Sequence, residues 1–111
     1  MPFDGLPEGL LSDMAKLRLA LDGVQRNWKK FKIGLQADDS HCALGWLLVA
    51  TDWDRDEATR LALEYVYPAL PEKARKTERL RSIHQFNDFG SRKRVVQLFA
   101  DAVQLAEQRL G

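Results

Sequence analysis

Apolar residues recur at helical spacing along most of the chain. In the first segment they are separated by alternating steps of four and three residues, at Leu10, Met14, Leu17, Leu21, Val24 and Trp28. This spacing places them on one face of a helix, although Gly23 interrupts the pattern. Ser12 or Asp13 can cap this helix, and Pro7 suits its start. We expect this face to pack against the core. The alternative is a homodimer seam through Leu10, Met14, Leu17 and Leu21.

The next two segments have different patterns. Apolar and polar residues alternate near residues 31–36, which predicts a short extended segment. Residues 42–50 are apolar throughout apart from Gly45, so we expect a central, buried helix at about residues 42–51. The stretch is too short to span a membrane, which takes about 20 apolar residues. Gly45 is expected to permit a close helix crossing.

Three further helices follow by the same reasoning. The 52–54 segment breaks the central helix, and Asp54 or Asp56 starts a helix that stops at Pro68. Pro71 begins a short basic helix, residues 85–90 form a loop, and Ser91 caps a last helix that runs to Leu110. The sequence therefore predicts an all-α fold, a compact bundle of about five helices in a single domain over residues 1–111.

Composition narrows the class of protein. The 111 residues have a net charge of +1, which argues against strong general attraction to nucleic acid or to an anionic membrane. With 45% apolar residues and one cysteine, the chain can form a core without a disulfide framework. The first residues show no signal-peptide pattern. We expect a cytoplasmic protein without a membrane partner.

The charges are unevenly distributed along the chain. Residues 38–64 contain seven acidic and two basic side chains, whereas residues 72–94 contain eight basic and three acidic ones. The basic segment supplies the candidate binding residues Arg79, Arg81, Arg92, Lys93 and Arg94. Three of these cations lie in the first turn of the last helix, where they oppose the helix dipole. The segment could pair with the acidic half, bind an acidic protein surface, or contact phosphates beside Phe86 and Phe89.

One set of residues has the composition of a catalytic site. Cys42 at a helix N-terminus would have a lowered pKa, His84 could act as its base, and Asn87 or Asp88 could orient the imidazole. The alternative is a buried cysteine that packs as a small apolar residue, with Asn87 and Asp88 holding a turn. We expect no metal site and no cofactor, because metal-ligand spacing and phosphate-loop motifs are both absent from the sequence.

The motif residues resemble those of a known group. The pattern consists of a Trp, a Cys-Ala-Leu-Gly helix start, and an Asn-Asp pair before an amphipathic last helix. The matching residues here are Trp28, Cys42, Ala43, Leu44, Gly45, Leu47, Asn87 and Asp88. The chain thereby resembles a family of small bacterial and phage proteins of unknown function. It differs at Trp46 and Phe86, where the family has a small residue and a Trp. The resemblance implies a phage or mobile-element setting. It supplies no catalytic residues, because the activity of the family is not established.

These observations favour a small non-enzymatic helical domain that binds another protein. We expect the partner to present an acidic surface. A nucleic-acid-binding module that uses residues 72–94 is the alternative, and a cysteine hydrolase that uses Cys42 and His84 is a third hypothesis. Trp46 lies within the expected central helix, and Trp53 lies just beyond its end. We expect them to pack in the core, or to anchor an interface if they are exposed.

Overall fold

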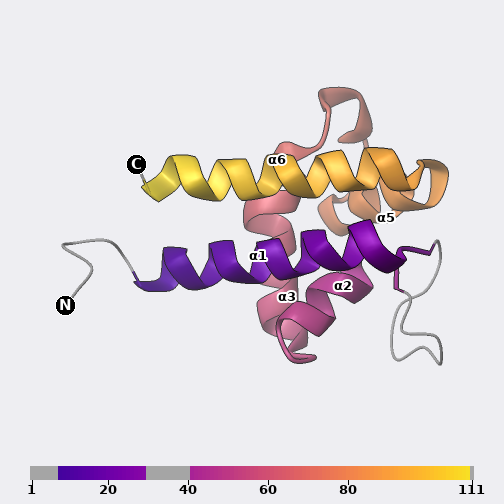
Figure 1. Ribbon diagram of the computed structural model, residues 1–111. Helices are drawn as coiled ribbons and strands as arrows, with labels where there is room; N and C mark the ends of the chain where they lie inside the picture. Colours follow the sequence, from indigo (N-terminus) through magenta and orange to yellow (C-terminus); the bar gives the residue numbers. More distant parts are fainter. Residues whose placement is uncertain (1–7, 30–40, 111) are drawn as a thin grey trace.

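The chain folds into a compact bundle of helices (Figure 1). The computed structural model describes residues 8–29 and 41–110, so the extended segment expected near residues 31–36 lies outside the described residues. The elements in chain order are α1 (Glu8–Asn27), α2 (Ala43–Ala50), α3 (Arg55–Leu61), the π-helical turn η1 (Ala62–Val66), α4 (Tyr67–Ala69), the 3₁₀ turn η2 (Glu72–Ala74), α5 (Arg79–Phe89) and α6 (Arg92–Leu110). The described residues contain no β-strand beyond one isolated bridge between Trp28 and His41. The all-α prediction is confirmed.

The two long helices, α1 and α6, lie side by side and run in opposite directions (Figure 1). Leu17 and Val24 of the predicted stripe are fully buried, and Met14 and Leu21 pack against the same core. The stripe therefore faces the core of its own chain. The face of α6 that is buried with it contributes Val95, Leu98, Phe99, Ala102, Val103 and Ala106.

Gly23 does not interrupt α1, which continues unbroken to Asn27. Instead it makes room for a neighbouring side chain. A Cβ at Gly23 would lie 2.2 Å from the ring of Trp46, so only a glycine lets this indole pack directly on the α1 backbone. Trp46 is buried there, and its Nε1–H donates to the carbonyl oxygen of Asn27 at 3.2 Å. The expectation that Trp46 packs in the core is confirmed.

Helix α2 packs against α1, α3 and α5. It ends in a tight turn in which Asp52 and Trp53 adopt positive φ angles of 56° and 65°. The Thr51 hydroxyl donates within this turn, and the Asp54 side chain accepts from the Glu57 N–H at 3.1 Å as the cap of α3. The predicted break at residues 52–54 and the Asp54 cap are thus confirmed. Trp53 is 39% exposed and only partly packed.

The prediction for residues 71–90 is wrong in two respects. Pro71 starts only the single turn η2, because α5 begins later, where Glu78 accepts from the N–H groups of Leu80 and Arg81. The segment 85–90, expected as a loop, is mostly the second half of α5. Ile83, Phe86 and Asn87 continue one buried helical face, and this burial keeps the segment helical. Ser91 caps α6 as expected, accepting from the Arg94 N–H at 3.3 Å.

The expected cap of the first helix at Ser12 or Asp13 is also wrong. The helix begins by Glu8, so Asp13 lies inside α1 rather than at its cap, and its carboxylate is buried.

Candidate functional site

The corner between α5 and α6 gathers cations around two aromatic rings. We define the basic–aromatic face as Lys73, Lys76, Phe86, Phe89 and Arg94, which line one surface hollow of about 250 Å³ together with Ala74 and Gln85. The residues come from η2, the segment after it, α5 and α6. Chain segments up to about 20 residues apart are therefore combined into one surface.

Gly90 makes this corner possible. A Cβ at this position would lie 2.6 Å from the backbone oxygen of Phe86, so a larger residue would clash with the last turn of α5. Because the helices turn so tightly here, the Arg94 guanidinium lies 4.8 Å from the centre of the Phe86 ring, within cation–π range. Phe89, one helical turn on from Phe86, is 82% exposed.

The cations of the basic segment are not neutralised within the described residues. The ion pairs found there involve other cations, namely Lys16 with Glu57, Arg18 with Glu107, Arg26 with Asp22, and Arg60 with Asp13, Glu57 and Glu64. None joins residues 52–64 to residues 72–94. The alternative in which the two halves pair with one another is therefore not found in the part of the chain that the structure describes, which omits Asp38 and Asp39.

The acidic half uses its charges in a network between α1 and α3. Arg60 and Tyr65 both donate to the buried Asp13 carboxylate, Tyr65 at 2.7 Å. Burial raises the pKa of Asp13, but the hydrogen bonds from Arg60 and Tyr65 outweigh it and hold the pKa below its ordinary value. Hydrogen bonds from Arg60 and Lys16 lower the pKa of Glu57 from 4.5 to about 2. These carboxylates are thus charged, and their hydrogen-bond donors and counter-charges come from the protein itself.

The candidate binding residues do not all lie together. Arg94 belongs to the basic–aromatic face, whereas Arg79 and Arg81 lie in the first turn of α5, next to Glu78. Arg92 and Lys93 are exposed in the first turn of α6. Lys73 and Lys76, which join Arg94 around the hollow, were not singled out from the sequence. Their position depends on the turn between η2 and α5, which periodicity does not reveal.

Cys42 has the opposite character from that expected of a nucleophile. It is 1% exposed, and burial raises the pKa of its thiol despite its place at the start of α2. No hydrogen bond joins Cys42 to His84 in the described residues. His84 lines a hollow with Leu44 and Leu80, and Cys42 is not part of its lining. The expected lowering of the Cys42 pKa is therefore wrong, because desolvation exceeds the effect of the helix N-terminus.

Asn87 was expected to hold a turn. It lies inside α5 instead and is 2% exposed. Its Oδ1 accepts from the Trp28 indole at 2.6 Å and from the Ala43 N–H at 3.0 Å, while its Nδ2 donates to Asp88. It therefore caps α2 from a neighbouring helix instead of orienting His84. Three of the motif residues, Trp28, Ala43 and Asn87, meet at this point.

The described chain is thus an all-α bundle with a basic–aromatic face at one corner. Within residues 8–29 and 41–110, no helix has both the length and the apolar character needed to cross a membrane. The same residues bring no three His, Cys, Asp or Glu side chains together around a possible metal position. Comparisons with protein-family models, with curated proteins and with solved structures found no match. Function is therefore inferred from geometry and charge.

Proposed function

We propose that this protein is a non-enzymatic interaction module whose basic–aromatic face binds an acidic surface of another protein. The observation that carries the proposal is the absence of ion-pair partners, in the described residues, for the cations of residues 72–94. The single turn η2 and the Gly90 corner hold three of these cations around an aromatic hollow. A carboxylate-bearing partner would supply the missing counter-charges.

The exposed aromatic ring supports a protein partner. Phe89 presents most of its ring to solvent beside the hollow, and buried aromatic and arginine side chains are enriched among residues that dominate protein–protein binding energy. A second hollow of about 320 Å³ shares Phe86 and Arg94 with the first and is also lined by Leu98. The acidic side chains of a partner would meet the cations of the first hollow. Its apolar side chains would meet Phe86 and Leu98 in the second hollow, which Asp101 also lines.

Nucleic acid is the competing ligand, since exposed aromatic rings among cations also stack with unpaired bases. The overall net charge of +1 favours a protein, because a nucleic-acid-binding domain usually has a strongly basic surface. We place the module in the cytoplasm on the basis of its single cysteine. A bacterial or phage setting follows from the sequence resemblance.

Charge reversal at the face tests the proposal. The variant Lys76→Glu/Arg94→Glu should lose binding of a fluorescent peptide of alternating Glu and Phe, measured by anisotropy. The control Arg18→Glu/Lys29→Glu changes the net charge equally on exposed residues outside the face and should retain binding. Phe89→Ala should weaken binding without changing the charge. Circular dichroism would check that each variant is folded.

The same titration with single-stranded and duplex oligonucleotides separates the two ligand classes. Tighter binding to an oligonucleotide, with a steep dependence on salt concentration, would replace the proposal with nucleic-acid binding. Equal loss of peptide binding in both double variants would show that net charge alone is responsible and would overturn the assignment to this face.

A further inference from the structure

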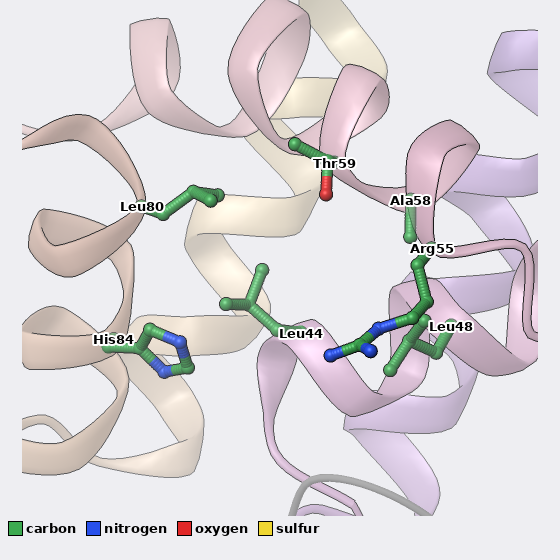
Figure 2. Close-up of a pocket in the computed structure, with 7 residues that line it drawn as sticks. All are labelled: Leu44, Leu48, Arg55, Ala58, Thr59, Leu80 and His84. Carbon is green, nitrogen blue, oxygen red and sulfur yellow. The ribbon is translucent and has the colours of Figure 1, made fainter.

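A separate hollow lies between α2, α3 and α5, away from the basic–aromatic face (Figure 2). Each of the three helices contributes a pair of residues four positions apart, which therefore lie on the same helical face. The pairs are Leu44 and Leu48 on α2, Arg55 and Thr59 on α3, and Leu80 and His84 on α5, with Ala58 completing the lining. The hollow has a volume of about 150 Å³.

The lining combines three leucine side chains with a rim of three polar groups. Leu44, Leu48 and Leu80 supply the apolar surface, and Figure 2 shows the Thr59 hydroxyl oxygen pointing into the hollow from above it. The Arg55 side chain extends along α2 toward Leu44, and the His84 ring stands on the opposite side. A ligand in the hollow would therefore meet three leucine side chains and three polar ones.

The polar groups on this rim have no partners in the described residues. Arg55, Thr59 and His84 form no side-chain hydrogen bond or ion pair there. Arg60, in the last turn of the same helix, is in contrast held by three carboxylates. Arg55 is thus the cation of this helix that remains available. A guanidinium group, a hydroxyl and an imidazole N–H can all donate to one carboxylate.

From this arrangement we propose that the hollow binds a small free carboxylic acid whose body is a single ring or a short branched chain. Arg55 pairs with the carboxylate, Thr59 and His84 donate to it, and the three leucines cover the apolar body. A cavity of about 150 Å³ accommodates a ring of the size of benzene. A carboxylate suits the site better than a phosphate dianion because the rim offers only one permanent cation.

Titration with benzoate, followed by amide chemical shifts in NMR, tests this proposal. We expect shifts at Leu44, Leu48, Thr59, Leu80 and His84, with a Kd on the order of 1 mM for so small a ligand. Benzamide has the same shape without the charge and should bind about tenfold more weakly, as should benzoate to Arg55→Gln. Arg75→Gln removes an equally exposed charge outside the hollow and should leave the Kd unchanged.

The proposal is overturned if benzoate shifts residues elsewhere, if it shifts none, or if benzamide and benzoate bind equally well. Filling the hollow with Leu80→Phe gives an independent check, because it should abolish the benzoate shifts while Arg55 and His84 remain. Since Arg55 and Thr59 do not belong to the basic–aromatic face, peptide binding at that face can fail without affecting this result.

Discussion

The indole Nε1–H of Trp28 donates to Oδ1 of Asn87 at 2.6 Å, although the two residues are 59 positions apart. The same oxygen accepts from the Ala43 N–H, and Cys42 supplies no side-chain cap to α2. One amide oxygen therefore joins the end of α1, the start of α2 and the last turn of α5. Because Asn87 is buried, loss of this oxygen leaves donors without a partner.

Asn87→Ala should lower the free energy of unfolding by about 2 kcal/mol, because it removes the acceptor of two donors at a buried position. Urea denaturation measures the effect. Gln85→Ala, at an exposed position of the same helix, serves as the control and should change stability by less than about 0.5 kcal/mol.

A double-mutant cycle with Trp28→Phe isolates the indole hydrogen bond. We expect a coupling energy of about 1 kcal/mol between Trp28→Phe and Asn87→Ala. Strictly additive effects would show that the hydrogen bond contributes nothing to stability.

Gly23→Ala should destabilise the protein by about 1–3 kcal/mol, although the same change in a helix interior ordinarily stabilises by about 1 kcal/mol. The reason is the ring of Trp46, which lies where the new Cβ would be. Thermal unfolding measures the change. Gln25→Ala is a matched exposed control on α1. In a Trp46→Leu background the cost of Gly23→Ala should shrink, and an unchanged cost would rule out the contact with the ring as its cause.

Stability should fall as the pH is lowered from about 5 toward 2. The folded pKa of Glu57 is about 2, below its ordinary value of 4.5, so its contribution is complete above pH 4.5 and is lost on acidification toward pH 2. Asp13, whose pKa is also lowered, acts in the same direction. Urea denaturation at several pH values gives the free energy of unfolding as a function of pH. The slope of this pH dependence should be shallower for Glu57→Gln than for the native chain. The exposed Glu72→Gln should retain the native slope, and equal slopes for all three proteins would contradict this assignment.

Cys42 should react slowly with a thiol reagent in the native protein, because it is buried and its thiol pKa is raised. At pH 8 we expect alkylation by iodoacetamide to be at least about 100-fold slower than in guanidinium chloride, since labelling must await local opening. Native and unfolded rates of similar size would restore the hypothesis of a reactive cysteine.

Periodicity alone determined the class of this fold. The stripe from Met14 to Val24, the apolar segment of α2, the break at residues 52–54 and the caps Asp54 and Ser91 are all local features. They can be predicted from the sequence because helix hydrogen bonds and caps join residues within about four positions of one another. The same periodicity did not show that α5 continues past Gln85, because a loop and a helix end both accept Asn and Asp.

Only the tertiary structure decided which helical faces meet. Gly23 reads as an interruption until Trp46 lies against it, and Asn87 reads as a turn residue until Trp28 and Ala43 reach it. The packing of the helices also brings Lys73, Lys76 and Arg94 together at one corner. It likewise places Arg55 across a hollow from His84. Hydrophobic burial drives such packing without specifying direction, so the partners of each face depend on the shape of the whole chain.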